Sequence, residues 1–425
     1  MKIIKILLLI FIVYNITIPE PIVITGKMLP SFIGEKISSI RVVNSLGKSI
    51  PYQIDEVEDN EYVCSYGDEP NKGNGILDTA DEIVFLWEDA DSVVTNFVNE
   101  IPLKENYKKL TQVTITNKLE KRCIYFISDS SIPLSKVKYI EYDSKNEIIY
   151  TPYYYAKFEP KRFHFVRAGI REQQNGMKEY SDITNELRIK IFLKALWGLL
   201  PITYTEQNIV CYVKRFKAGP IRLIRRGDFH LNLGLFLQGS HAAVNQICYP
   251  QIVRVPVYVH LPVRFKNLFK EAYIEMSPVM LNNAYNFKFE VPSYNLLFPF
   301  SSSKKIDTLV KKMPNLTCMT VHNNVSGFGW FLDATIDTSK IDGSGYCIQI
   351  PSERKSLAHA GFRLAINDLP KGYYLIGVWF VFSLNGINDL YNACEQVSDL
   401  SIINVEGSKN KYYNQIIKIM PFKKR

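Results

Sequence analysis

An acidic, glycine-punctuated segment, residues 68–87, is the stretch whose spacing most directly suggests chemistry. Ca²⁺ binds hard oxygen ligands, and an EF-hand-type loop needs a glycine at its sixth position. If Gly75 takes that position, Asn74, Asp78 and Asp81 take the fifth, ninth and twelfth. The segment therefore predicts a calcium site with Asn74, Asp78 and Asp81 as its metal ligands.

The first half of the same loop predicts something else. Pro70 and Lys72 would hold the first and third positions, and neither side chain can ligate Ca²⁺. The competing interpretation is an Asx-rich turn in which Asp78 caps the next element. Ca²⁺ is thus one of two interpretations, and no cofactor is certain.

A second group of chemistry-bearing residues is basic and lies between Lys214 and Arg226. Alternation along a strand separates Arg222 from its apolar neighbours, and we expect Arg225 at the end of that strand. Arginine can bind a carboxylate through two parallel hydrogen bonds. With His230 nearby, Arg222 and Arg225 are the candidate substrate-binding residues for an acidic polysaccharide. The alternative is a set of solvated charges at a strand end.

A third group sets cations and a candidate base beside aromatic rings: His164, Arg167 and Arg171 follow the tyrosines at 153–155. A lyase acting on uronic acids needs a cation for the carboxylate and a base for the proton. The competing interpretation is an aromatic sheet face on which arginine stems pack. The sequence contains no HExxH, GxSxG, phosphate-loop or dinucleotide-binding fingerprint. Catalytic residues are therefore unknown, and whether the chain is an enzyme stays open.

These residues lie in a chain that alternates apolar and polar positions from end to end. The period-2 stretches include 39–43, 112–116, 229–233 and 252–259, and the run 373–382 is apolar throughout. Aromatic residues make up 13% of the chain, which favours strands. Residues 186–200 fit a helix or a strand, and 307–312 fit a short helix. We expect a mainly β fold.

The predicted organisation has three parts. Residues 1–18 form a signal peptide, since Lys2 and Lys5 precede an apolar run, Ile6–Tyr14, that is too short to span a bilayer. Residues 19–105 form a small N-terminal β module that contains the acidic loop. Residues 106–425 form a large antiparallel β-sandwich, of the supersandwich kind. Beyond the signal, the sequence predicts no transmembrane segment.

The net charge of +9 comes from scattered basic residues rather than from a block. Nucleic-acid binding would need a basic cluster such as the one at 214–226 together with a recognised reading element, and no such element is visible in the sequence. The same charge suits a groove for an acidic polysaccharide. The signal predicts a periplasmic or secreted protein. The seven cysteines show no CxxC or metal-site spacing, so we expect most of them to be small buried side chains.

Three phrases together resemble a group of exported bacterial proteins of unknown function. They are IPYQIDE at 50–56, GILD through DEIVF to DAD at 75–91, and AGPIRLIRR at 218–226. The group carries a PFQIDE and LDxxDELVF module followed by a GPVRVIRR strand. A similar N-terminal phrase, less closely matched, occurs in proteins related to polysaccharide lyases of the rhamnogalacturonan type, which have large β-sandwich domains. Here Tyr52 replaces the usual phenylalanine and Asp91 a common glycine.

The resemblance implies an exported, carbohydrate-associated protein that binds a glycan or acts on it as a lyase does. The group has no agreed catalytic residues, so none can be transferred. The alternative is a non-enzymatic envelope or interaction protein that uses a β-sandwich as scaffold.

Overall fold

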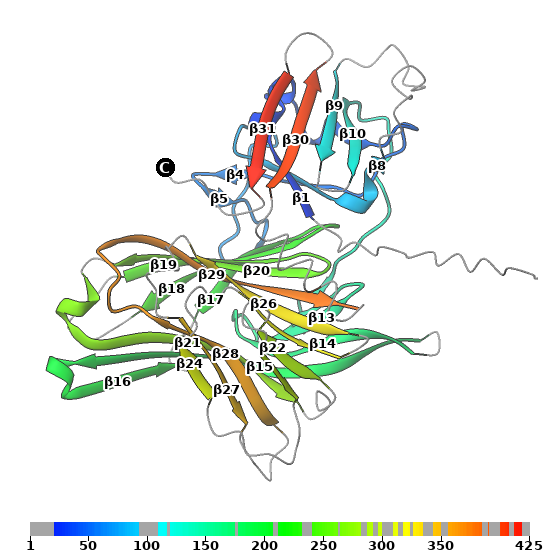
Figure 1. Cartoon of the computed structure of the whole chain (residues 1–425). Coiled ribbons are helices and arrows are strands. Elements are labelled where there is room, and N and C mark those ends of the chain that lie inside the picture. The colour runs from blue at the N-terminus through cyan, green and yellow to red at the C-terminus, as the bar shows by residue number, and fades with distance from the viewer. Residues whose placement is uncertain are drawn as a thin grey trace, which may run out of the picture.

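The computed structural model describes residues 21–92, 109–116, 120–174, 177–206, 211–231, 240–261, 264–281, 287–291, 296–299, 309–312, 318–323, 326–334, 343–349, 356–384, 390, 400–407 and 412–418. In this part of the chain the fold is mainly β, as predicted, and its sheets are antiparallel. Two β-sandwiches lie one above the other in Figure 1. No helix among these residues is long and apolar enough to cross a bilayer.

The N-terminal sandwich has an inner and an outer sheet. The inner sheet has the order β1-β7-β3, with strands Pro21–Thr25, Glu82–Leu86 and Gln53–Asp55. The outer sheet has the order β2-β10-β9-β30-β31, with β8 on β10; its strands are Ile40–Val43, Lys121–Ser128, Leu110–Thr116, Leu400–Gly407, Tyr412–Lys418 and, for β8, Asp91–Ser92. A small hairpin joins β4 (Val57–Glu58) to β5 (Glu61–Tyr62).

The outer N-terminal sheet crosses the boundary predicted between residues 105 and 106. Strands β9 and β10 follow that boundary, yet β10 pairs with β2, and β30 returns from the C-terminal part to pair with β9. Strand pairing is set by buried faces rather than by position in the chain. The sequence-based division therefore does not coincide with the sheets.

The large sandwich also has two sheets. Its outer sheet runs β11-β12-β13-β14-β15-β21-β28-β27-β24, with β16 on β15; the strands are Glu141–Asp143, Ile148–Tyr150, Tyr154–Phe158, Phe165–Gln174, Met177–Ala195, Phe269–Leu281, Ser356–Ala365, Gly343–Gln349, Leu309–Lys312 and, for β16, Leu200–Thr205.

The inner sheet of the large sandwich has the order β23-β22-β25-β26-β29-β20-β19-β18-β17-β6. Its strands are Leu296–Pro299, Lys288–Val291, Cys318–His322, Gly327–Ala334, Gly372–Ser383, Ile252–Leu261, Ser240–Cys248, Leu223–Leu231, Cys211–Ala218 and Tyr66–Gly67. Short 3-10 turns connect strands; they are Gly26–Met28, Pro30–Phe32, Ile37–Ser39, Trp87–Asp89, Leu196–Gly198 and Phe265–Asn267.

Burial explains why some strands are continuously apolar. In β7, Ile83 and Phe85 pack into the core of the N-terminal sandwich, whereas Val84 and Leu86 pack against the large sandwich. The predicted apolar strand 373–382 corresponds to β29, whose residues 378–382 are all buried. A strand buried on both faces loses the alternation of a half-exposed strand. The N-terminal sandwich thus covers one face of the inner large sheet.

The helical interpretations are wrong where the structure describes these segments. Residues 186–195 belong to β15 and residues 309–312 form β24, while 307 and 308 lie outside the described residues. In β15, Ile191, Leu193 and Ala195 are buried, whereas Phe192 and Lys194 between them are half-buried, which is the period of a strand.

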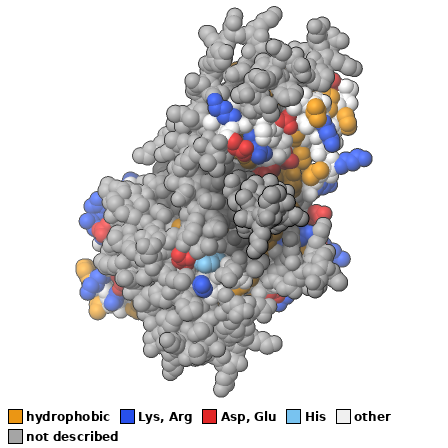
Figure 2. Space-filling model, turned by 45° about the vertical axis from the view of Figure 1, so that its right-hand side comes forward, with side chains coloured by type: hydrophobic (Ala, Val, Ile, Leu, Met, Phe, Trp, Pro, Cys, Tyr) orange, Lys and Arg blue, Asp and Glu red, His pale blue; other side chains and the backbone are white. Residues whose placement is uncertain are grey.

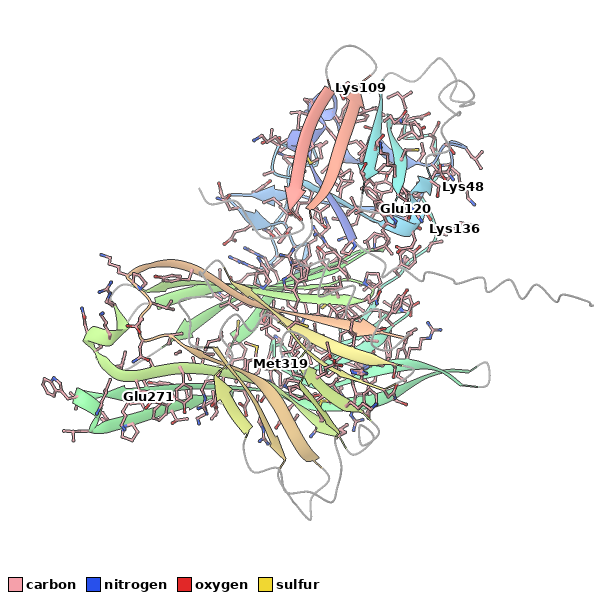
Figure 3. All side chains as sticks on the ribbon, viewed as in Figure 1. Lys48, Lys109, Glu120, Lys136, Glu271 and Met319 are labelled. Carbon is pink, nitrogen blue, oxygen red and sulfur yellow. The ribbon has the colours of Figure 1, made fainter. Side chains whose placement is uncertain are left out.

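Figure 3 shows Met319, a fully buried core residue, between the sheets of the large sandwich, and Lys48 and Lys109 on the N-terminal one.

Candidate functional site

Three phrases of the sequence meet in one buried cluster between the two sandwiches. The side-chain oxygen of Gln53 accepts hydrogen bonds from the backbone N–H groups of Ile221 and Arg222, at 3.3 and 3.0 Å. Its amide nitrogen donates to Asp55 at 2.9 Å. A Cβ atom at Gly219 would lie 2.1 Å from that Gln53 oxygen, so this close approach requires glycine. The phrases around residues 53 and 219 are therefore parts of one contact.

The guanidinium group of Arg222 is the centre of this cluster. It donates to Asp55 at 2.7 Å, to Glu82 at 2.6 Å and to the Tyr249 hydroxyl at 2.9 Å, and it lies over the ring of Tyr62. The Arg222 side chain is 1% exposed. A buried charge needs such partners, because its desolvation is costly. We name this group, Gln53, Asp55, Glu82, Arg222 and Tyr249, the buried arginine cluster.

The pKa of Asp55 reflects the positive charges beside it. Burial alone would raise the pKa of this carboxyl, but the charges of Arg222 and Lys217 and the hydrogen bond from Gln53 outweigh burial and lower its pKa. Lys217 lies 2.9 Å from the same carboxylate. Asp55 is therefore held ionised in the interior, where it joins the two sandwiches.

The predicted sugar-binding role of Arg222 and Arg225 is wrong for this arrangement. Arg225 is fully buried and lies inside β18, not at its end; it pairs with Glu147 at 2.8 Å and packs over Phe158. A polysaccharide on the surface cannot reach either guanidinium. Alternation in the sequence distinguished the two faces of this strand, but it could not show that other segments of the chain bury both faces. The side chain of His230 lies outside the described residues.

The acidic loop is built as a hydrogen-bonded turn. Asp81 is buried, and its two carboxylate oxygens accept the backbone N–H groups of Val57 and Asp78, at 2.8 and 2.7 Å. Asn74 donates to Asp78 at 2.7 Å and accepts the N–H of Ile76. In the described part of the chain, no three His, Cys, Asp or Glu side chains gather in a metal-binding geometry. The calcium site at Asn74, Asp78 and Asp81 stays a prediction, and the turn accounts for the spacing without it.

A tyrosine-rich patch lies on the outer large sheet. The rings of Tyr150, Tyr155 and Tyr180 lie 5.4–6.4 Å apart, centroid to centroid, and all three are half-buried. The Tyr155 ring lies over Gly169, where a Cβ atom would be 2.5 Å away. Aromatic side chains often cover a strand glycine in this way. We name Tyr150, Tyr155 and Tyr180 the tyrosine face.

Charged groups border the tyrosine face. The Tyr155 hydroxyl donates to Asp182, and Arg167 lies 3.3 Å from the same carboxylate. Burial raises the pKa of Asp182. The Arg167 side chain is 54% exposed, so its remaining donors are open to solvent. Two residues of the third group, Tyr155 and Arg167, thus lie on one outer face, whereas Tyr154 points into the core.

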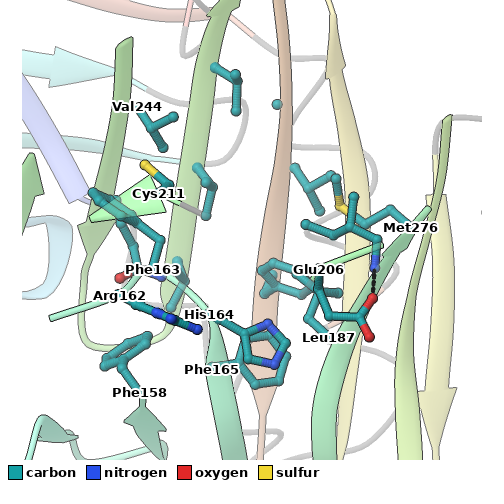
Figure 4. Close-up of a pocket in the computed structure, with 18 of the residues that line it drawn as sticks. Phe158, Arg162, Phe163, His164, Phe165, Leu187, Glu206, Cys211, Val244 and Met276 are labelled. Atoms are coloured by element: carbon teal, nitrogen blue, oxygen red, sulfur yellow. Dashed lines mark hydrogen bonds between the residues drawn. The ribbon is translucent and has the colours of Figure 1, made fainter. Parts of the chain in front are cut away.

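A cavity of about 240 Å³ lies between the two large sheets (Figure 4). Its walls are almost wholly apolar and come from both sheets; they include Ala156, Ala168, Leu187, Met276, Val244 and Phe380. Genuinely empty cavities are apolar, and an engineered one of about 150 Å³ binds benzene. The sequence pattern did not predict this cavity, because alternation shows which residues face inward but not whether their side chains fill the space between the sheets.

Polar side chains gather at one side of this cavity. They are Glu159, Arg162, His164 and Glu206, and Figure 4 shows the last three along the lower part of the view. Arg162 pairs with Glu159 at 2.9 Å, and Glu206 accepts the backbone N–H of Ile189 at 3.2 Å. The fixed charges are one guanidinium and two carboxylates. The polar side can therefore exchange hydrogen bonds with a neutral group but does not favour an anion.

No protein-family model and no curated protein sequence matches this chain. Solved structures that resemble it include an α-mannosidase from Enterococcus faecalis V583 and a glycosyl hydrolase family 38 protein from Enterococcus faecalis, each with a TM-score of 0.46 and 7% identity over 92% of this chain. The chain spans 44% and 46% of the length of those proteins. The Slr1438 protein from Synechocystis sp. PCC 6803 aligns over 59% of this chain and 97% of its own, with a TM-score of 0.31 and 8% identity. The similarity to the group of exported proteins stays a prediction.

Proposed function

We propose that this chain is an exported, non-enzymatic binding protein whose ligand is an uncharged amphiphile held in the cavity between the large sheets. The cavity carries the proposal: it is apolar, lies between two rigid sheets and has polar groups at one side. Binding pockets of this kind bury an apolar body and fix its polar end with a few groups. By proportion with the cavity that holds the six carbons of benzene, its volume suits about ten carbons.

The polar end of the ligand follows from the charges. A hydroxyl group can donate to Glu159 or Glu206 and accept from Arg162 or His164. A carboxylate would face two carboxylates with one guanidinium, which Glu159 already engages. The proposed ligand class is therefore a medium-chain alcohol or a related neutral lipid.

Titration with 1-decanol, decanoate and decylammonium tests this proposal. We expect decanol to raise the melting temperature most, since a ligand bound to the native state stabilises it. Ala168→Leu fills the cavity wall and should abolish the rise. Ala90→Leu is the matched control, because Ala90 is equally buried in the N-terminal core. Equal effects of the three compounds, or a rise that survives Ala168→Leu, would contradict the proposal.

A second candidate function is glycan binding on the tyrosine face, and the location beside Arg167 favours it. Sugar rings stack on aromatic side chains, and Arg167 offers exposed donors for the carboxylate of an acidic sugar. This keeps the carbohydrate association predicted from the sequence and moves its candidate residues away from Arg222 and Arg225. Uronate-oligomer binding should weaken in Tyr180→Ala but not in the control Tyr212→Ala, whose exposed ring lies elsewhere. No binding by the unaltered chain would discard this candidate.

Both candidates include export to the periplasm or the medium, which the first 18 residues support by charge and apolar length. Fractionation of cells that carry a C-terminal epitope tests it. We expect the tag outside the cytosol, and a full-length protein confined to the cytosol would contradict export.

A further inference from the structure

The hairpin tip between β15 and β16 carries exposed apolar side chains. Trp197 is 89% exposed and Leu199 83%, and Leu196 and Leu200 are also exposed. Strand β16 pairs with β15 in the large outer sheet, and it lies at the end of the large sandwich remote from the N-terminal one (Figure 1). Large apolar residues that gather at one projecting point mark an interaction site, whereas single exposed ones are ordinary.

The backbone holds these side chains outward. Leu196, Trp197 and Gly198 have φ angles of 50°, 55° and 97°, all in the left-handed region. That region costs an L-residue about 1–2 kcal/mol, so the backbone conformation of the turn disfavours Leu196 and Trp197. No tertiary packing of Trp197 is gained in return, since the side chain is almost fully in solvent. The turn therefore presents its apolar residues at a cost to the fold.

Lysines border this tip. A Cβ atom at Gly198 would lie 2.8 Å from the Lys270 stem and 3.6 Å from that of Lys194, so both stems lie against the turn. Lys266, in the 3-10 turn before β21, is exposed near the start of the same strand. Glu271, labelled in Figure 3, and Asp368 are exposed acidic residues in this region. Arg264, in the same turn as Lys266, is a further exposed cation. The border therefore has a positive balance around an apolar centre.

We propose that this tip inserts into the surface of a bilayer that contains anionic lipids. Tryptophan and leucine enter the boundary between headgroups and acyl chains, while lysines bind anionic headgroups. On the N-terminal sandwich, in the upper part of Figure 2, the described basic and acidic side chains lie next to one another. Apolar centre and basic border together fit a lipid surface better than a second copy of the chain, whose identical lysines would repel.

The chain contains its own reporter for this interaction. Of its four tryptophans, Trp87, Trp330 and Trp379 are buried, so a soluble or lipid-borne quencher reaches Trp197 selectively. With phosphatidylcholine vesicles that contain phosphatidylglycerol, we expect brominated acyl chains to quench the Trp197 emission. Iodide should no longer reach the same ring. Vesicles without phosphatidylglycerol should bind about fivefold more weakly for each lysine that has no anionic headgroup to bind.

Variants in the full chain complete the test, so that residues 1–20 contribute equally throughout. We expect the double variant Trp197→Ser/Leu199→Ser to bind vesicles at least about tenfold more weakly, and Lys194→Gln/Lys270→Gln to lose the preference for anionic lipid. Leu46→Ser is the matched control, since Leu46 is 77% exposed in a turn of the other sandwich. Equal binding by all variants overturns the proposal. Self-association of the unaltered chain without vesicles, abolished by the tip variant, overturns it in favour of a dimer.

Discussion

The guanidinium of Arg222 lies 2.7 Å from the carboxylate of Asp55, which precedes it by 167 residues in the chain. Asp55 belongs to the inner N-terminal sheet, and Arg222 comes directly before β18 of the large sandwich. This ion pair therefore ties the two sandwiches together at a point without solvent. Both side chains are buried, so the loss of either one removes a main partner of the other buried charge, which would keep only Lys217 beside Asp55 or Glu82 beside Arg222.

We expect Arg222→Ala to lower the free energy of unfolding by about 3 kcal/mol, because the buried Asp55 and the half-buried Glu82 would both lose this partner, although Lys217 would still lie beside Asp55. Urea denaturation of the two proteins measures this difference. Arg167→Ala is the matched control, since its pair with Asp182 is half-exposed and should contribute less than about 1 kcal/mol. Equal destabilisation in the two variants would show that the cluster does not join the sandwiches.

Sequence patterns predicted the strands well, but they could not say what covers each strand. The alternation around Arg222 separated its face from that of its apolar neighbours, yet the partners Asp55 and Glu82 lie 167 and 140 residues earlier. Conversely, the close approach of Gln53 to Gly219 gives a physical reason for two of the phrases that carry the resemblance. The phrases marked important residues; only the fold shows that their importance here is structural.

The cavity and the exposed hairpin tip could not be predicted from the sequence for the same reason: the pattern does not show which residues pack against each strand. Ala168 was one apolar position among many in the sequence, and its small side chain leaves space only because the facing residues do not fill it. Trp197 stood in a segment that fitted a helix or a strand, and neither interpretation contained the turn at 196–198. That turn leaves the Trp197 side chain in solvent.

Asp81 tests how the acidic loop is held. We expect Asp81→Ala to lower the unfolding free energy by about 1–2 kcal/mol, because the half-buried backbone N–H groups of Val57 and Asp78 lose their acceptor. The decrease should be the same with Ca²⁺ and with a chelator. A melting temperature that rises with Ca²⁺, and no longer does so in Asp78→Ala, would instead establish the calcium site.

Cys211 tests the accessibility of the cavity wall. Burial, the largest of several influences, raises the pKa of its thiol to about 12, so little thiolate exists at neutral pH. We expect alkylation by iodoacetamide at pH 8 to be slow in the folded chain and to become fast in denaturant, since the thiolate is the nucleophile. Mass spectrometry of the Cys211 peptide over time measures both rates. Rapid labelling of the folded chain would contradict this burial.

Asp89 should give the protein a pH-dependent stability. Its pKa is raised from 3.8 to about 6, chiefly by burial, although the Tyr139 hydroxyl donates to it at 2.8 Å. The folded chain therefore holds a proton that the unfolded chain releases between about pH 4 and pH 6. The contribution of Asp89 to the free energy of unfolding is highest below about pH 4 and falls as the pH rises from about 4 to about 6. Above about pH 6 the ionised Asp89 destabilises the folded chain by its full amount.

We expect Asp89→Asn, which resembles the protonated carboxyl, to raise the unfolding free energy at pH 7.5 by about 2 kcal/mol, after allowance for partial exposure. Below about pH 3 the difference that comes from Asp89 titration should vanish, since Asp89 is then protonated in both states. Urea denaturation from pH 3 to pH 8 measures the two curves. Glu88→Gln, at an exposed neighbouring position, is the control and should leave the slope unchanged. A constant difference between Asp89→Asn and the unaltered chain across this range would show that Asp89 does not titrate within it.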